Sequence, residues 1–336
     1  MIRFAWLQFR MQAAVAAGAL AIVAVVLALT GPDLAHLYDS TIASCAAHHD
    51  CSTAAAAFTG TDGPLQVFLD FFVLAVPLLI GMFWGAPLIS REFEAGTFRL
   101  AWTQGVTRTR WLAVKLGLGA VASAAIAGLL SLMVSWWSSQ LDQVNANPFD
   151  SLRFGVRDIV PIGYAAFAFA LGLTAGLIFR RMLPAMLAAL VGFVAAREAV
   201  TAWVRPHLFT PLHQSLPITT ATPVSIDQTS PGIIKAFENT RGISLPDAWV
   251  YSVQIVDQAD HTPTESFLSR ACPLGNYGPL NPRDCTARLA ATFHQLVTYQ
   301  PGSRYWPMQW YELAIFLSLS IVFGGFCFWW IRRPAI

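Results

Sequence analysis

The charged segment REFEAGTFRLAWTQGVTRTRWLAVK, residues Arg91–Lys115, is the stretch from which the fold can be worked out. Seven of its 25 residues are charged, whereas only 12% of the residues in the whole chain are. Long apolar runs lie on both sides of it. The segment is therefore predicted to be a polar connection between two membrane-crossing helices.

The composition of the chain is typical of a membrane protein. Its 336 residues are 55% hydrophobic and include 12 Trp and 23 Phe, which departs from the average of soluble domains. The net charge is only +2 and the basic residues are scattered, so nucleic-acid binding is not expected. Only Lys115 and Lys235 are lysines, which indicates a GC-rich genome, and we expect a bacterial, actinobacterial source.

A hydrocarbon core of about 30 Å requires about 20 apolar residues in a helix. Segments of about that length are Ala13–Leu29, Val67–Ile89, Val114–Trp137, Val160–Phe179, Pro184–Val204 and Tyr311–Ile331. The first resembles a signal peptide, because Arg3 and Arg10 precede an Ala-rich run. The five later spans favour an uncleaved first helix.

The distribution of Arg and Lys predicts the orientation of these spans. If both termini are cytoplasmic, the inner segments contain Arg3, Arg10, Arg91, Arg99, Arg108, Arg110, Lys115, Arg180, Arg181, Arg332 and Arg333. The first outer loop, Thr30–Gln66, then has no Lys or Arg. We therefore expect an all-α polytopic membrane protein with six transmembrane helices and both termini in the cytoplasm.

The third outer loop, Arg205–Trp310, is rich in Pro, Thr, Ser and Asp and is long enough to fold by itself. We expect a small extracytoplasmic domain of mixed structure over residues 205–310, between helices 5 and 6. Helices 1–5, with a cytoplasmic coupling loop at residues 90–113, occupy residues 1–204, and helix 6 with a cytoplasmic tail occupies residues 311–336. Trp306 and Trp310 are the predicted interfacial anchors, as in an aromatic belt.

The positions of the cysteines agree with this orientation. Cys45 and Cys51 lie in the first outer loop, and Cys272 and Cys285 lie in the third. Two close pairs on the oxidising side predict two disulfides, and the alternative is four unpaired thiols in polar loops. The adjacent residues HHDC, ending at Cys51, rarely converge on one ion, so no metal site is predicted.

Catalytic and nucleotide-binding motifs are absent from the sequence. It contains no G-x-x-x-x-G-K-[ST], so the chain cannot by itself hold a nucleotide's phosphates in a P-loop. It also contains no G-x-S-x-G and no H-E-x-x-H. We therefore predict no catalytic residue, no cofactor in this chain and no enzymatic activity.

Arg197 and Glu198 interrupt the fifth span, where a charge facing lipid costs several kcal/mol. Adjacent side chains diverge by about 100° on a helix, so the two are not expected to pair with each other. Either the span breaks there into two helices that line a wet cavity, which we favour, or each charge has a partner inside the bundle. Both residues are candidates for a translocation path.

Two small-residue motifs predict close helix contacts. GMFWG (Gly81–Gly85) and GLTAG (Gly172–Gly176) both have small residues four positions apart, which lets helix backbones approach in lipid. The contacts can lie within one subunit or between two.

Within the opening segment, Gly96 is predicted to end the helix that continues the second span. Thr97 can cap a short helix over residues 98–104, on which Phe98 and Trp102 share one face. Thr107 can cap the helix that leads into the third span. The short helix could lie in the lipid headgroups, or it could insert into a cytosolic partner with Phe98, Leu100 and Trp102 as anchors.

A further set of residues in this segment carries a family resemblance, namely Glu92, Glu94, Gly96, Thr97, Leu100, Val106, Thr107, Arg108 and Lys115. They resemble the pattern E-x-E-x-G-T … L … (P)-V-(S/T)-R … K in the first cytoplasmic loop of ABC-2 type transporter permeases. In that family the loop forms a coupling helix that docks on a separate ATP-binding subunit. Gly105 stands where the family often has proline, and the outer domain is longer than usual.

The resemblance implies the membrane-spanning permease subunit of an ABC transporter in the bacterial cytoplasmic membrane. It implies two copies of an ABC ATP-binding subunit, which bind ATP and Mg, and a second permease subunit, identical or paralogous. Export of a hydrophobic or amphipathic compound is the expected activity.

Two other functions are compatible with the sequence. An ion-coupled secondary transporter needs ionisable residues near the bilayer midplane, for which we identify only Arg197 and Glu198. A membrane-anchored sensor would use its outer domain to bind a ligand. Neither explains a docking helix between the second and third spans.

Overall fold

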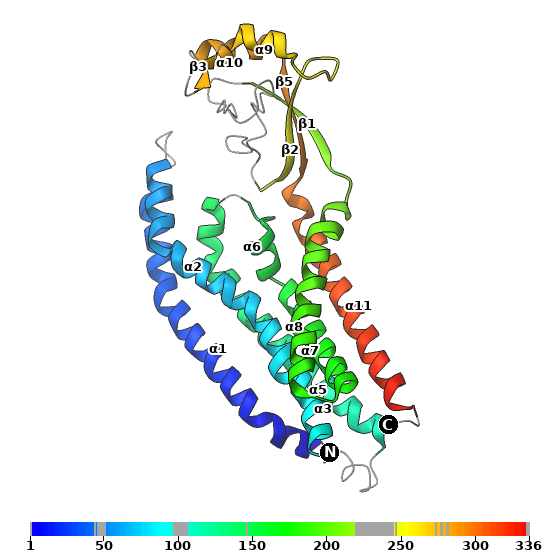
Figure 1. Ribbon diagram of the computed structural model, residues 1–336. Coiled ribbons are helices and arrows are strands. Elements are labelled where there is room, and N and C mark those ends of the chain that lie inside the picture. The colour runs from blue at the N-terminus through cyan, green and yellow to red at the C-terminus, as the bar shows by residue number, and fades with distance from the viewer. Residues whose placement is uncertain are drawn as a thin grey trace. The chain divides into compact units, whose positions relative to one another are not determined.

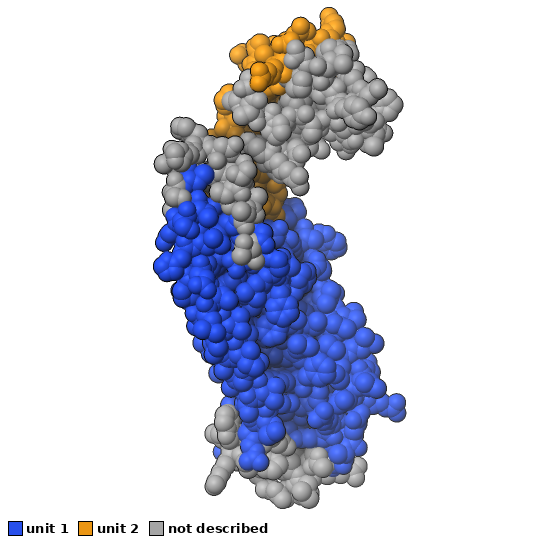
Figure 2. All heavy atoms as spheres, turned by 90° about the vertical axis from the view of Figure 1, so that its left-hand side faces the viewer, with its two compact units in different colours: residues 1–145, 150–208, 306–336 blue, residues 146–149, 209–305 orange. Residues whose placement is uncertain are grey.

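The computed structural model describes residues 2–43, 45, 52–96, 107–145, 147–218, 245, 247–272, 274–275, 278–279 and 282–333. The chain forms two compact units (Figure 2). Unit 1 contains residues 1–145, 150–208 and 306–336, and unit 2 contains residues 146–149 and 209–305.

Unit 1 is built from helices (Figure 1). Its α-helices are α1 (Ile2–Tyr38), α2 (Ser52–Ile80), α3 (Ala86–Glu94), α5 (Arg108–Asn145), α6 (Ser151–Val156), α7 (Val160–Phe179), α8 (Met182–Ala199) and α11 (Tyr305–Ile331). Short π or 3-10 turns extend or join them: η1 (Asp39–Ala43), η2 (Gly81–Gly85), η3 (Val200–Val204) and η4 (Arg205–His207).

Six helical segments in the described residues are long and apolar enough to cross a membrane. They are Arg10–Ile42, Asp62–Glu94, Arg108–Val144, Val160–Phe179, Met182–His207 and Gly302–Ile331. The prediction of six spans in a mostly helical chain is therefore confirmed, and the protein is a multi-pass membrane protein. The α1 helix begins and α11 ends at the same end of unit 1, beside α3 (Figure 1).

Several of these helices extend well beyond the bilayer. The α5 helix has 38 residues and is therefore about 57 Å long, nearly twice the thickness of a hydrocarbon core. The prediction of Thr30–Gln66 as a loop is wrong, because α1 continues to Tyr38 and α2 begins at Ser52. These extensions are stabilised by packing, since Leu34 and Phe58 belong to one buried cluster with Trp137 and Leu141 of α5.

The α7 helix is the most buried of the spans, and glycines let α2, η2 and α3 approach its backbone. A Cβ atom on Gly172 would lie 2.1 Å from the carbonyl oxygen of Gly81, and one on Gly85 would lie 2.6 Å from that of Phe169. A Cβ on Gly176 would similarly lie 2.5 Å from the oxygen of Ala86. The two predicted small-residue motifs therefore contact each other within one chain.

The described part of unit 2 contains a three-stranded sheet, the two-stranded sheet β3-β4 and two short α-helices. The antiparallel sheet has the strand order β1-β5-β2, with β1 (Leu212–Pro217), β2 (Trp249–Val256) and β5 (His294–Gln300). The remaining elements are α9 (Glu265–Ala271), β3 (Leu274–Gly275), β4 (Gly278–Pro279), α10 (Pro282–Ala290) and the turn η5 (Gly302–Arg304).

One predicted disulfide is present in unit 2. Cys272, which directly follows α9, is bonded to Cys285 of α10. Both cysteines are buried in an apolar cluster with Ile255 and Leu289. The other predicted pair includes Cys51, which lies outside the described residues, so that disulfide stays a prediction.

Candidate functional site

The ends of the predicted coupling loop are well defined. The α3 helix ends at Glu94, and Gly96 follows with a positive φ of 70°, a conformation that glycine adopts without strain. At the start of α5, the Thr107 hydroxyl accepts a hydrogen bond from the backbone N–H of Arg110 at 3.3 Å. The predicted helix end and helix cap are thus confirmed, and Arg108 is the first residue of α5.

The residues between these two ends lie outside the described residues. They include five of the predicted coupling residues, Thr97, Phe98, Leu100, Trp102 and Val106. Their docking role therefore stays a prediction, as does the short crosswise helix.

An ion pair joins the two helices that flank the loop. The Lys115 ammonium of α5 binds the Glu92 carboxylate of α3, and the lysine side chain is buried. The same ammonium lies over the Trp111 ring, 4.7 Å from its centroid, and 3.5 Å from the carbonyl oxygen of Leu88. Because an isolated buried charge is costly, Lys115 keeps the end of α3 beside the start of α5.

The second acidic residue of the signature contacts a different helix. The Glu94 carboxylate accepts a hydrogen bond of 2.9 Å from the backbone N–H of Met182, the first residue of α8. No side chain of its own caps α8, so Glu94 supplies an acceptor to a helix N-terminus, where negative charge is favourable. Nearby, the Arg180 guanidinium lies over the Phe93 ring at 5.7 Å.

Apolar packing completes this region, which we call the α3–α5 junction (residues 86–96 and 107–116). Ile89, Trp111 and Leu112 share one buried cluster with Leu177 of α7 and Ile331 of α11. The ends of the coupling loop are therefore fixed to three other spans, α7, α8 and α11. Movement of the loop would be transmitted to these helices because packed interiors shift as units.

The structure corrects two expectations about Arg197 and Glu198. The helix is not broken at Arg197, because α8 continues to Ala199 and the π turn η3 follows directly. The two side chains also pair with each other, at 2.5 Å between Nη1 and Oε1, because the long arginine side chain bridges their angular separation. Arg197 is buried and Glu198 is exposed, so the adjacent charges lie on different faces of α8.

A second buried arginine lies one helical segment further along the chain. Arg205 of η4 donates from Nε and Nη2 to the two Glu312 oxygens of α11, both at 2.9 Å. The Tyr164 hydroxyl of α7 donates to Glu312 at 2.5 Å, and the Arg205 guanidinium lies 4.3 Å from the centroid of the Phe154 ring. This cluster ties α6, α7, η4 and α11 together.

A third arginine cluster lies where α6 leads into α7. Arg157 binds Asp70 of α2 at 2.5 Å and Asp142 of α5 at 3.0 Å. Burial by itself would lower the pKa of the Arg157 guanidinium, but the Asp142 and Asp70 carboxylates outweigh it and raise that pKa above its ordinary value. Gln66 also donates to Asp142 at 2.7 Å.

The sequence analysis missed the Arg205 and Arg157 clusters. Asp70 and Glu312 fall inside predicted spans, and an ionisable residue in a span is a recognised signal. The prediction that Arg205 begins the outer loop is wrong, because this residue lies in the last helical segment of the fifth span.

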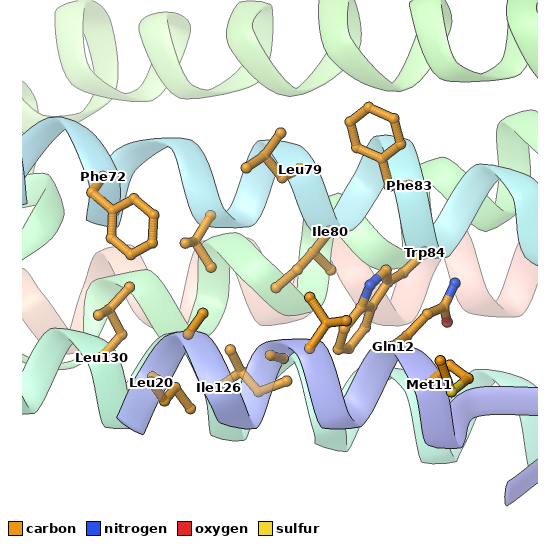
Figure 3. A pocket seen from close by; sticks show the side chains of 14 residues that line it. Met11, Gln12, Leu20, Phe72, Leu79, Ile80, Phe83, Trp84, Ile126 and Leu130 are labelled. Atoms are coloured by element: carbon orange, nitrogen blue, oxygen red, sulfur yellow. The ribbon is translucent and has the colours of Figure 1, made fainter. Parts of the chain in front are cut away.

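An apolar groove of about 450 Å³ lies between α1, α2 and α5 (Figure 3). Its wall includes Phe72, Phe83 and Trp84, and Gln12 is the polar amide that lines it. Elsewhere in unit 1, Trp306 and Trp310 are exposed near the start of α11, which suits an interfacial position. Their anchoring role stays a prediction.

Among the described residues, no group of three or more His, Cys, Asp or Glu side chains has an arrangement that could hold a metal ion.

Comparison with known proteins identifies one family. A family model described as ABC-2 membrane transporter related matches residues 17–205, which is more than half of the chain. The matched region contains α2, α3, α5, α6, α7 and α8, and therefore the whole α3–α5 junction and the three arginines that are buried among the described residues. No curated protein and no solved structure matches the chain.

Proposed function

Because this chain belongs to the ABC-2 membrane transporter related family, we propose that it is the permease subunit of an ATP-driven ABC transporter. ATP and Mg are bound by a separate ATP-binding subunit, since the sequence has no P-loop. The complex contains two such subunits and two permease subunits, either identical or paralogous. It resides in the bacterial cytoplasmic membrane, with both termini inside and unit 2 outside.

The construction of the α3–α5 junction is the observation that carries this proposal. Glu92 and Lys115, two residues of the family signature, bind each other across the base of the loop, and Glu94 binds the start of α8. These contacts support a firmly held loop that presents Phe98, Leu100 and Trp102 to the ATP-binding subunit. ATP-dependent movement of that subunit would then reach α7, α8 and α11.

The cargo is a hydrophobic or amphipathic compound, and the direction is export. The apolar groove between α1, α2 and α5 supports an apolar cargo, because its volume is three times that of an apolar cavity of about 150 Å³ that accommodates benzene.

The test is co-purification of the tagged full-length chain with a P-loop ATPase from its native membranes. Phe98→Asp and Trp102→Asp should each reduce recovery of the ATPase at least roughly tenfold, because an interface anchor is worth about 2 kcal/mol or more. Thr103→Asp is the matched control, since it adds the same charge on the other face of the predicted helix and should retain binding.

Undiminished ATPase recovery with both aromatic variants would contradict the docking role of the loop. Failure of the wild-type chain to recover any P-loop ATPase would contradict the proposed function as a whole.

A further inference from the structure

The three arginines that are buried in the described part of unit 1 differ in how their charges are neutralised. Arg205 is only 1% exposed and binds both oxygens of Glu312, a fully buried carboxylate from another helix. Arg157 is also buried and binds carboxylates from two other helices. Arg157 and Arg205 thus form three ion pairs with carboxylates of other helices, and loss of Asp70 or Glu312, which are both buried, would take a buried partner away from a buried guanidinium.

Arg197 is paired much less completely. Arg197 is a buried residue whose side chain is 11% exposed, and its Nε atom has no hydrogen-bond partner among the described residues. Its ion-pair partner in the described part of the chain is the adjacent Glu198, which binds through one oxygen and whose side chain is 59% exposed. An exposed carboxylate contributes little net free energy to such a pair, so Glu198 can be exchanged for another anion.

The backbone of Gly155 lies close to both the Arg197 guanidinium and the Tyr164 hydroxyl. The point that a Cβ atom on Gly155 would occupy lies 3.5 Å from Arg197 Nη2 and 3.2 Å from the Tyr164 hydroxyl. Since Gly155 of α6 has no Cβ, its backbone can lie close to both groups. The Nη2 atom of Arg197 therefore lies beside Gly155 within the bundle, while its Nη1 atom binds the exposed Glu198.

An apolar stripe on α8 leads to this ion pair. Leu183, Leu187, Val191 and Val194 are all exposed, and their spacing places them on the same face of the helix as Glu198. The stripe extends over about 22 Å from position 183 to position 198. An alkyl chain along this stripe would have its polar end at Arg197.

We propose that Arg197 binds the anionic headgroup of an amphipathic ligand, either a phosphate monoester or a carboxylate, and that Glu198 is the counter-ion this headgroup displaces. That this ligand is the transported cargo rests on the proposed function, but binding itself requires only this chain. Exchange of one anion for another keeps the buried guanidinium neutralised throughout, so the ligand enters without a stage at which the Arg197 charge is unpaired.

The test is equilibrium binding of a fluorescent dodecyl phosphate to the full-length chain in phosphatidylcholine nanodiscs, without any ATPase. Glu198→Gln removes the competing carboxylate and should tighten binding several-fold. Arg197→Gln should weaken it at least roughly tenfold, because a hydrogen bond to a charged group is worth about 1.5–3 kcal/mol. Asp39→Asn is the matched control, since it removes an exposed carboxylate on a different helical segment and should leave the affinity unchanged.

The gain expected for Glu198→Gln keeps the proposal testable even if Arg197→Gln fails to fold, because misfolding cannot tighten binding. Unchanged or weaker binding by Glu198→Gln would overturn the proposal, as would full binding by a folded Arg197→Gln variant. A dodecyl ammonium probe should bind weakly, and equal binding of the two probes would also overturn it. Equal affinity for inorganic phosphate would overturn the assignment of an amphipathic ligand. None of these results depends on whether an ATPase co-purifies.

Discussion

Lys115 lies near the start of a membrane-crossing helix, and yet its charged side chain is buried. Its charge is neutralised by Glu92, which belongs to the helix on the other side of the coupling loop. The two residues are 23 positions apart in sequence, so their ion pair closes the loop at its base. Their ion pair therefore holds the two ends of the loop together.

Reversal of one of these charges should destabilise unit 1. Lys115→Glu would place two carboxylates together in a buried site, and we expect a loss of about 3 kcal/mol or more in the free energy of unfolding. The double variant Glu92→Lys with Lys115→Glu should recover part of that loss. Thermal unfolding of the detergent-solubilised chain measures both effects, and a double variant less stable than Lys115→Glu alone would contradict the ion-pair assignment.

The sequence predicts individual charged sites better than it predicts their partners. Arg197 and Glu198 were recognised because they interrupt an apolar run, but their pairing depends on a side-chain conformation that sequence spacing does not determine. Arg205 and Glu312 are 107 positions apart, and only the packing of η4 against α11 brings them together. Asp70 lies close to the start of a predicted span, where a charge is easily mistaken for an interfacial residue.

At the scale of the elements, the backbones of η2 and α7 pack directly against each other. Because Gly172 faces the carbonyl oxygen of Gly81, even one methyl group would have no space. Gly325 of α11, by contrast, has no heavy atom within 4 Å of its Cβ position.

We therefore expect Gly172→Ala to destabilise the chain by about 3 kcal/mol, at the upper end of the cost of overpacking, because the obstructing atom belongs to a helix backbone. Gly325→Ala is the matched control and should change stability by less than about 1 kcal/mol. Thermal unfolding and the yield of monodisperse protein measure the effect of each substitution on stability. Equal stability of the two variants would show that η2 and α7 are not packed this closely.

Unit 2 should depend on the disulfide between Cys272 and Cys285, which are 13 positions apart. Replacing both with serine should cost about 3 kcal/mol of stability, because the unfolded segment is no longer restrained. Limited proteolysis of the full chain should then cleave faster within residues 209–305. Cys327→Ala removes the free buried thiol of α11 instead and should leave that cleavage rate unchanged, whereas equal rates for all variants would contradict a stabilising disulfide.

The number of spans could be predicted from hydropathy, but their lengths could not. Hydropathy detects only the part of a helix that lies in lipid. The ends of α1, α2 and α5 contain polar residues and Ala, and tertiary packing around Trp137 makes them helical. The end of α3 was predictable, because the glycine at position 96 favours a local break in the helix. The contact of Glu94 with α8 was not predictable, because it depends on tertiary packing.

At the scale of the whole molecule, six spans bring the start of α1 and the end of α11 to the same end of unit 1 (Figure 1). The α3–α5 junction lies at that end as well (Figure 1). Family membership and this arrangement agree with an energy-supplying partner that binds there. An ion-coupled transporter would instead be driven by an ion gradient and would use ionisable groups within the spans to bind the ion, and Arg157 and Arg205 are already neutralised by carboxylates.

ATP-dependent movement of dodecyl phosphate across proteoliposome membranes distinguishes an ATP-driven permease from an ion-coupled transporter. The liposomes would contain the permease together with the ATPase recovered with it, and the controls would be Trp102→Asp and the omission of ATP. We expect movement that requires ATP and is lost in Trp102→Asp, without any imposed ion gradient. Movement that proceeds without ATP and follows a proton or sodium gradient would contradict an ATP-driven permease.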